Sequence, residues 1–251
     1  MNLKSEARNS DFEFIYRLVD QSTIVDKKKR SLTGKHILIT YGPTWIALDD
    51  TRTISNISSG RLGQCLVGDF AKAGCRVTAL EGPVTHRLAD RLGKKSGKNI
   101  SIKKFVYYDE FVHLVSQELK SPYDVMIQAA AVSDYRLSHP AKTKWSSERK
   151  RIHLELVPTE KVINRVKEKN PDIFLIGFKL NSRIHQGNAL AHARKLFTMA
   201  GCDLVVANSL TDDQYRGFII DPKEGLVASR NTREALSKAL VVAVQKKIAY
   251  E

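Results

Sequence analysis

Side chains suited to binding phosphate or carboxylate groups follow the first apolar run of the chain. Asn56, Ser58 and Ser59 precede Gly60, and an amphipathic stretch through Ala71 comes next. Consecutive backbone N–H groups at a helix start, with hydroxyl groups beside them, form a binding site for such anions. The Asn56 amide does not titrate, so it can orient a carboxyl oxygen but cannot act as a general base. An ordinary N-cap and glycine turn is the safer interpretation of Ser-Ser-Gly alone, so other segments must decide.

A second group of small and polar residues ends the fourth predicted strand. Residues 128–135 read Gln-Ala-Ala-Ala-Val-Ser-Asp-Tyr, and small side chains there let a planar or phosphorylated ligand reach the backbone. Close packing against a helix explains the alanines equally well, but Asp134 is a charge placed directly after an apolar strand. Lys144 follows ten positions later in an irregular segment. A mobile ammonium group there suits neutralisation of a triphosphate, although most loop lysines are simply solvated.

The turn after the first strand reads Gly42-Pro43-Thr44. A small residue lets a ligand approach the backbone there, but on its own the motif is only a turn. The dinucleotide fingerprint G-x-G-x-x-G does not follow this strand, and the sequence has no Walker lysine motif and no zinc-type His and Glu pair. The seven histidines are scattered, which is more typical of surface or packing residues than of catalytic bases. Arg52, in the next loop, reads as a surface residue when taken alone.

These residues belong to a chain that alternates between strand and helix patterns from His36 onward. The predicted strands are 36–41, 76–80, 101–105, 124–130, 173–179 and 203–207, and the predicted helices are 60–74, 84–93, 108–120, 159–168, 187–200 and 231–247. Such alternation predicts an α/β fold with a doubly wound, mostly parallel Rossmann-like sheet and helices on both faces. Ligands of such folds bind beyond the carboxyl ends of the strands.

Two regions depart from this alternation. Residues 135–150 show neither the helical nor the strand pattern of apolar residues, which predicts a long functional or disordered loop. The expected small antiparallel addition consists of an exposed strand over 152–157 and a hairpin joining 217–221 to 226–229.

Composition bounds the class of protein. The 251 residues suit one large α/β domain or two small ones. No apolar run approaches the ~20 residues of a membrane span, and no signal-peptide pattern opens the chain. Three cysteines are an odd count without metal-ligand spacing, which is typical of a reduced compartment. We therefore expect a cytoplasmic protein without a membrane partner.

The net charge of +14 is the one unusual total. It attracts polyanions, nucleic acid or phosphorylated metabolites. The only dense basic cluster is Lys27–Arg30, which lies in a polar N-terminal extension, residues 1–34, after a modest helix predicted over 11–19. We interpret this cluster as a solvated linker. Nucleic-acid binding is less favoured, because no aromatic residues interleave with the basic ones.

Taken together, these segments resemble the phosphopantothenate–cysteine ligase family, the synthetase half of the bifunctional flavoprotein of coenzyme A biosynthesis. The resemblance covers about His36 to Tyr250, which is the expected ligase domain within 35–251, and leaves residues 1–34 unaccounted for. It concerns the ligase part only, so no flavin is expected. The matching segments are Ile37–Thr44, Arg52–Gly63, Ala129–Tyr135, Lys144 before a Ser-Ser pair, Ile176–Leu180, Ala193–Lys195 and Asp203–Asn208.

The resemblance implies a ligase that joins 4′-phosphopantothenate to L-cysteine in two steps. The substrate carboxylate attacks the α-phosphate of a nucleoside triphosphate, which gives an acyl-nucleotide and pyrophosphate. The cysteine amine then attacks the acyl carbon and expels the nucleoside monophosphate. This chemistry needs positioning and charge neutralisation more than a strong base, and Mg²⁺ accompanies the triphosphate. The compact size favours CTP over ATP, although Val157-Pro158 and Ala131–Asp134 are similar to the ATP-using eukaryotic form.

The resemblance also implies roles for individual residues. Asn56 binds the substrate carboxylate and the acyl intermediate, and Lys144 contacts the triphosphate, so these two are the expected catalytic residues. Arg52 and Ala131 fall where phosphopantothenate binds, with Arg52 reaching the neighbouring subunit of a homodimer. The other nucleotide-binding positions are Gly42, Thr44, Ser58, Ser59, Gly60, Ala129, Ala130, Asp134, Phe178 and Lys195. The resemblance does not identify which residues hold the magnesium.

The chain departs from the family pattern at several positions. Pro43 replaces a glycine of the usual Gly-Gly-Thr turn and so removes a backbone donor that could have met a phosphate. Ser209 replaces the aspartate of an Ala-Asn-Asp ending. Leu196 and Ala200 stand where many bacterial relatives place lysines, and Lys195 is the expected substitute.

Two other functions stay open at this point. An NAD(P)-dependent oxidoreductase uses a similar sheet, although the glycine fingerprint and a Tyr-x-x-x-Lys pair are missing; submillimolar binding of NADPH would favour it. A basic nucleic-acid-binding protein is the third hypothesis, and it predicts binding that weakens steeply with salt.

Overall fold

The structure is a computed structural model that describes residues 31–86, 88, 99–211 and 214–248. The helix predicted over 11–19 and the basic cluster Lys27–Arg30 lie outside the described residues. So does most of the helix predicted over 84–93.

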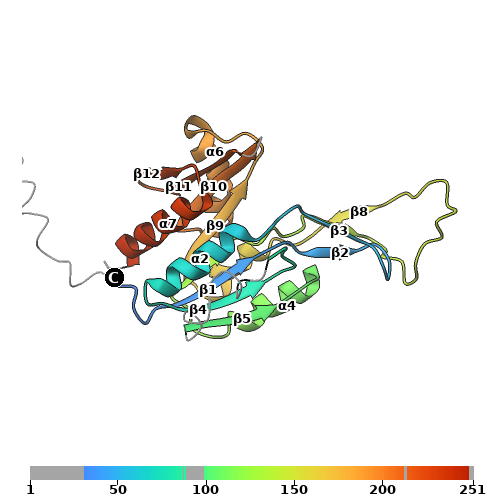
Figure 1. Cartoon of the computed structure of the whole chain (residues 1–251), viewed down its shortest axis with the longest axis horizontal. Coiled ribbons are helices and arrows are strands. Elements are labelled where there is room, and N and C mark those ends of the chain that lie inside the picture. The colour runs from blue at the N-terminus through green and yellow to red at the C-terminus, as the bar shows by residue number, and fades with distance from the viewer. Residues whose placement is uncertain (1–30, 87, 89–98, 212–213, 249–251) are drawn as a thin grey trace, which may run out of the picture.

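An eight-stranded sheet organises the fold, with the strand order β12-β11-β10-β9-β6-β1-β4-β5 (Figure 1). The strands from β10 to β5 in this order are parallel, whereas β11 and β12 are antiparallel. Their bounds are β1 His36–Tyr41, β4 Arg76–Glu81, β5 Ile100–Lys104, β6 Val125–Gln128, β9 Phe174–Leu180, β10 Leu204–Thr211, β11 Gln214–Asp221 and β12 Gly225–Arg230. The predicted α/β class is confirmed, as are the predicted parallel strands and the hairpin.

Helices cover both faces of the sheet (Figure 1). On one face lie α2 (Arg61–Lys72) and α7 (Arg233–Ile248), and on the other lie α4 (Tyr108–Glu118), η2 (Val162–Arg165), α5 (Val166–Lys169) and α6 (Gln186–Ala200). In β1, Ile37 and Ile39 pack toward α2, and Leu38 packs toward α4. A strand buried on both faces has no polar side, which explains why the parallel strands read as continuous apolar runs.

The helix predicted over 159–168 starts later and is shorter than expected. Thr159 donates its N–H to the carbonyl of Asp134 (2.9 Å) and its hydroxyl to the carbonyl of Ser133 (2.6 Å). Residue 159 therefore stays tied to the neighbouring segment, and the 3₁₀ turn η2 begins only at Val162.

Two small antiparallel pairs stand apart from the main sheet. One joins β2 (Trp45–Ala47) to β3 (Thr53–Ser55), and the other joins β7 (Tyr135–Leu137) to β8 (Leu156–Pro158). The prediction of a strand beginning at residue 152 was wrong, because pairing with β7 starts only at Leu156. The prediction of a loop from residue 135 was also wrong, because β7 occupies residues 135–137. A strand of three residues is too short to show a periodic pattern in the sequence.

The order of the strands reverses between β1 and β6. From β1 the chain passes to β4 and β5 on one side, and β6, β9 and β10 then lie on the other side. The carboxyl ends of β1 and β6 therefore form the topological switch point, where open α/β sheets bind their ligands.

Small residues continue both strands at the switch point. Pro43 forms a parallel bridge with Ala131. The Ala131 N–H donates to the carbonyl of Gly42 (2.9 Å), and the Ala131 carbonyl accepts from the N–H of Thr44 (3.3 Å). Because the bridge uses the residues on either side of Pro43, the missing N–H of the proline removes no hydrogen bond from it.

Gly63 in α2 packs against Tyr41 at the end of β1. A Cβ atom at Gly63 would lie 2.1 Å from the Cβ atom of Tyr41. Tyr41 is buried and donates its hydroxyl to Glu81 (2.6 Å), which holds the ring in place. We expect Gly63→Ala to lower the free energy of unfolding by about 1–3 kcal/mol through overpacking, measured by denaturant titration. Gly187→Ala is the matched control, because its Cβ would meet only His185 at 3.4 Å; equal midpoints for the two variants would contradict this packing.

Candidate active site at the carboxyl ends of β1 and β6

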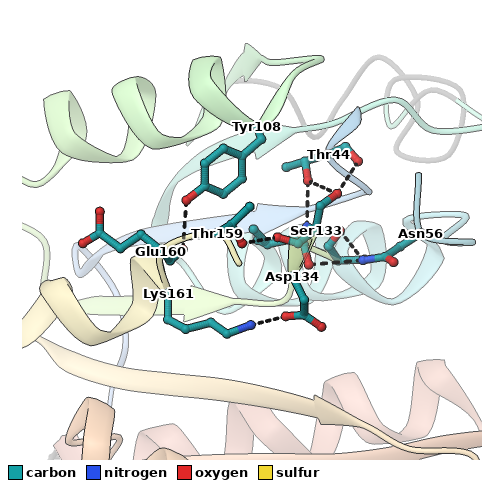
Figure 2. Close-up of polar contacts among 10 residues, drawn as sticks. Thr44, Asn56, Tyr108, Ser133, Asp134, Thr159, Glu160 and Lys161 are labelled. Atoms are coloured by element: carbon teal, nitrogen blue, oxygen red, sulfur yellow. Dashed lines mark hydrogen bonds and ion pairs between the residues drawn. The ribbon is translucent and has the colours of Figure 1, made fainter. Parts of the chain in front are cut away.

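Hydroxyl side chains join the segments that follow β1 and β6 (Figure 2). Thr44 Oγ1 donates to Ser133 Oγ (3.0 Å) and accepts from the Ser133 N–H (2.9 Å). Thr159 holds the carbonyl of Ser133 from the other side. Thr44 is 0% exposed, so its side chain is part of the framework that fixes the switch point, and its contact with a nucleotide stays a prediction. The sequence gives no signal for Ser133 and Thr159, because a hydroxyl residue does not reveal its partner.

Asn56 lies at the surface directly after β3, and its side chain points toward the end of β6 (Figure 2). Its Nδ2 donates to the carbonyl groups of Ala131 (3.2 Å) and Val132 (3.1 Å). Carbonyl oxygens only accept, so these contacts fix which way the amide lies. Among the described residues, none donates a hydrogen bond to Asn56 Oδ1. The structure thus brings Asn56 and Ala131 together and leaves an acceptor oxygen available.

The turn that was predicted to bind an anion forms the N-terminus of α2. Gly60 is its N-cap in the left-handed region, with φ of 71°, and a Cβ atom there would lie 2.4 Å from Val84 Cγ1. Ser59 Oγ accepts from the N–H of Arg61 (3.4 Å), no side chain caps the helix, and its first turn has no acidic residue. With Ser58 half-buried beside it, this helix end carries positive charge toward the carboxyl edge of the sheet.

Asp134 places an exposed carboxylate at the same edge and forms an ion pair with Lys161 (Figure 2). Lys161 is the N-cap of η2, two residues after Thr159, so the backbone that carries it is tied to residue 134. The hydroxyl of Tyr108 donates to the carbonyl of Glu160 (2.9 Å), and burial raises the pKa of Tyr108, which keeps the phenol neutral. Lys161 belongs to no motif, and sequence reasoning missed it.

The remaining predicted residues are not all brought to this edge together. Ala129 and Phe178 pack on the face covered by α2 and α7, and Ala130 packs on the opposite face. Lys195 is exposed on α6, which covers the face opposite Phe178. Lys144 is exposed in the long loop between β7 and β8 (Figure 1), and within the described residues it forms no hydrogen bond or ion pair.

Arg52 binds within its own chain. Its guanidinium lies 3.5 Å from Asp49 Oδ2 and donates to the carbonyl of Trp145 (3.1 Å). These contacts leave other donors of the guanidinium uncommitted, and the expected contact of Arg52 with phosphopantothenate stays a prediction.

Within residues 31–86, 88, 99–211 and 214–248, no group of three His, Cys, Asp or Glu side chains is arranged to hold a metal ion. Magnesium in nucleotide sites binds through one or two carboxylates plus substrate phosphates, and the exposed carboxylate at this edge, Asp134, is already paired with Lys161. In the same part of the chain, no helix combines the length and apolar character needed to cross a membrane.

Sequence comparison places this architecture among known proteins. The family model described as DNA/pantothenate metabolism flavoprotein C-terminal domain matches residues 32–250. The coenzyme A biosynthesis bifunctional protein CoaBC of Thermococcus kodakarensis is 35% identical over 199 residues, which are 79% of this chain and 46% of that protein. The CoaBC protein of Bacillus subtilis is 27% identical over 209 residues, 82% of this chain and 47% of that protein. The chain therefore spans about half the length of the curated relatives it matches.

Solved structures share the fold. The DNA/pantothenate metabolism flavoprotein from Streptococcus pneumoniae superimposes with a TM-score of 0.73 at 28% identity, covering 85% of this chain and all of that one. The H337A mutant of Cab2, solved in complex with phosphopantothenate-cysteine, has a TM-score of 0.69 at 18% identity and covers 98% of this chain and 96% of that one, which shows the shared fold alone. Because the family model spans nearly the whole sequence, the resemblance noted above is confirmed, and the chain belongs to the family of DNA/pantothenate metabolism flavoprotein C-terminal domains.

Proposed function

We propose that this protein is a ligase of coenzyme A biosynthesis that joins 4′-phosphopantothenate to L-cysteine through an acyl-nucleotide. The observation that carries the proposal is the Asn56 amide, held against Ala131 and Val132 at the switch point of a chain of this family. The N-terminus of α2 lies at the same edge and supplies backbone donors for phosphate. A polar side chain for the acyl group and a phosphate-binding turn are what the two-step reaction requires.

The orientation of Asn56 assigns it a step. Since Nδ2 donates to two main-chain carbonyl groups, Oδ1 is the atom available to a ligand. An amide oxygen repels a carboxylate but accepts a hydrogen bond from an amine. We therefore assign Asn56 to the second step, in which it orients the cysteine amine toward the acyl carbon, rather than to binding the substrate carboxylate.

Charge neutralisation falls to two lysines, Lys161 at this edge and Lys144 in the long loop between β7 and β8. The exposed ammonium of Lys144 has no partner among the described residues, so it is free to approach a triphosphate. Lys161 offsets the negative charge of Asp134, which would otherwise repel the same ligand. Magnesium, when bound with the triphosphate, adds charge neutralisation at the phosphates. CTP is the proposed nucleotide, and the intermediate is then an acyl-cytidylate; ATP is the alternative.

A cytoplasmic homodimer is the proposed working state. Exposed apolar side chains occur on the small antiparallel pairs, at Ile54 of β3, Tyr135 of β7 and Leu156 of β8. Apolar surface of this kind is commonly buried by association.

Measurement of each partial reaction tests the proposal. The purified full chain is incubated with Mg²⁺, 4′-phosphopantothenate, L-cysteine and either CTP or ATP. We expect pyrophosphate release only when nucleotide and phosphopantothenate are both present, and amide product only when cysteine is added, with CTP giving the higher kcat/KM. Pyrophosphate release at the same rate with and without phosphopantothenate, or no reaction with either nucleotide, would contradict the proposed function.

The Asp134–Lys161 ion pair gives a smaller and separable prediction. Lys161→Gln leaves the Asp134 carboxylate unpaired beside the triphosphate, so we expect the KM for nucleotide to rise by up to about fivefold, in line with an exposed pair. Adding Asp134→Asn removes the repulsion and restores part of the loss. Lys169→Gln is the control, because that lysine, the last residue of α5, donates to Ser116 of α4 (3.2 Å) and not to Asp134. A double variant no better than Lys161→Gln alone would show that Asp134 contacts the nucleotide in another way.

A further inference from the structure

Asp49 is a buried carboxylate that the proposed chemistry does not use. It lies in the loop between β2 and β3, and its side chain is 0% exposed. Its Oδ1 accepts from the N–H groups of Thr51 (2.9 Å) and Arg52 (2.8 Å) and from the Thr51 hydroxyl (3.1 Å). Aspartate often closes a turn in this manner, but the turn accounts for only one of its two oxygens.

The second oxygen reaches a distant part of the chain. Asp49 Oδ2 accepts from the N–H of Trp145 (3.1 Å), 96 positions away, and Arg52 donates to the Trp145 carbonyl (3.1 Å). The carboxylate and the guanidinium therefore hold the N–H and the C=O of one residue. The N–H of Ala141 also donates to the carbonyl of Leu48 (3.1 Å), which ties the same two loops together.

These contacts act on the loop that carries Lys144. Residues 138–155 have no regular structure and extend away from the main sheet (Figure 1). Among the described residues, the hydrogen bonds that join residues 140–154 to other parts of the chain are the three at Ala141 and Trp145. Lys144 is the residue directly before the one that is held, so the direction of its backbone is set by Asp49 and Arg52.

We propose that Asp49 and Arg52 form a clamp on Trp145 that positions Lys144 for the triphosphate. The hydrogen bonds described above are the evidence for the clamp. Its role in positioning Lys144 for a triphosphate rests on the proposed function. Asp49 is a positioning residue, since it acts through Lys144 and touches no substrate.

The clamp keeps its charge throughout the pH range of an enzyme assay. Burial opposes ionisation of Asp49, but hydrogen bonds from the N–H groups of Thr51, Trp145 and Arg52 and from the Thr51 hydroxyl outweigh it and lower the pKa to about 2. A carboxamide cannot replace this carboxylate, because its NH₂ group would face either the donors at Oδ1 or the N–H of Trp145.

Trypsin provides a direct test, because it cleaves the Lys144–Trp145 bond whose N–H Asp49 holds. In the folded full chain, we expect Asp49→Asn to accelerate cleavage at this bond about tenfold, as the loss of a charged hydrogen bond allows. The control is Asp50→Asn, the same change at the adjacent exposed carboxylate, which leaves cleavage unchanged. Should Asp49→Asn fold poorly, Arg52→Lys keeps a cation beside Asp49 but gives up the planar donor fork and is expected to accelerate the same cleavage.

Activity shows whether the clamp acts through Lys144. We expect Asp49→Asn to lower kcat for pyrophosphate release with little change in KM for 4′-phosphopantothenate, and to cause no further loss in a Lys144→Ala background. Equal cleavage rates for Asp49→Asn and Asp50→Asn would refute the clamp. Faster cleavage with losses that add in the Lys144→Ala background would refute its action through Lys144. If the unmodified chain lacks ligase activity, the proposed function fails, while cleavage of the Lys144–Trp145 bond still decides whether the clamp sets the position of Lys144.

Discussion

Lys144→Ala is expected to slow nucleotide-dependent pyrophosphate release by about 10²–10³-fold, the usual effect of removing one group that stabilises transition-state charge. The lysine is exposed and has no hydrogen bond or ion pair within the described residues, so its ammonium is not committed to a structural contact. Attack of a carboxylate on the α-phosphate concentrates negative charge on the phosphate oxygens, and a cation placed beside them stabilises that charge more in the transition state than in the ground state.

The loop supplies its own control for this substitution. Lys142 is an exposed lysine two positions earlier in the same loop, and Lys142→Ala removes the same charge from the chain. If net charge alone recruits the nucleotide, the two variants lose activity equally and added salt weakens both in the same way. If the position of the Lys144 ammonium determines activity, only Lys144→Ala loses turnover, and the unfolding midpoint of both variants stays at the wild-type value. Equal losses would exclude Lys144 from the reaction.

The parallel sheet could be predicted from the sequence because strands that are buried on both faces consist almost entirely of apolar residues. β1 and β6 pack against helices on both faces, so each appears as an apolar run. By contrast, β2, β3 and β7 have three residues each, too few to show a period, and their pairing depends on contacts with distant segments. The fold class follows from the long elements, whereas the small antiparallel pairs beside the site do not.

The candidate site also has features that the sequence predicts and features that it does not. Glycine and alanine at strand ends mark where a ligand can approach the backbone, and the bridge between Pro43 and Ala131 lies at that place. The sequence cannot show which groups a side chain binds, so it does not reveal that Thr44 binds Ser133. Lys161 and Asp49 have partners 27 and 96 positions away, and separations of that size leave no local pattern.

Asn56→Asp tests the assignment of the amide to the second step. The change keeps the size of the side chain but places an oxygen where Nδ2 now donates to the carbonyls of Ala131 and Val132. Three acceptors cannot share that space, so the new carboxylate turns away and the amine loses its fixed acceptor. A displacement of about 1 Å at a reacting centre costs on the order of 100-fold, and we expect amide formation to fall by at least about that factor.

Rapid-quench measurement of both products separates this role from carboxylate binding. With Asn56→Asp we expect one equivalent of pyrophosphate per site to be released at close to the normal rate, followed by slow, cysteine-dependent formation of the amide. Asn170→Asp, the same chemical change at the C-cap of α5, is expected to leave both steps unchanged. If pyrophosphate release and amide formation fall together, Asn56 acts when the carboxylate is activated. In that case the Asn56 side chain would have to rotate so that Nδ2 rather than Oδ1 faces the carboxylate. This rotation would break both hydrogen bonds that hold Nδ2 against the end of β6.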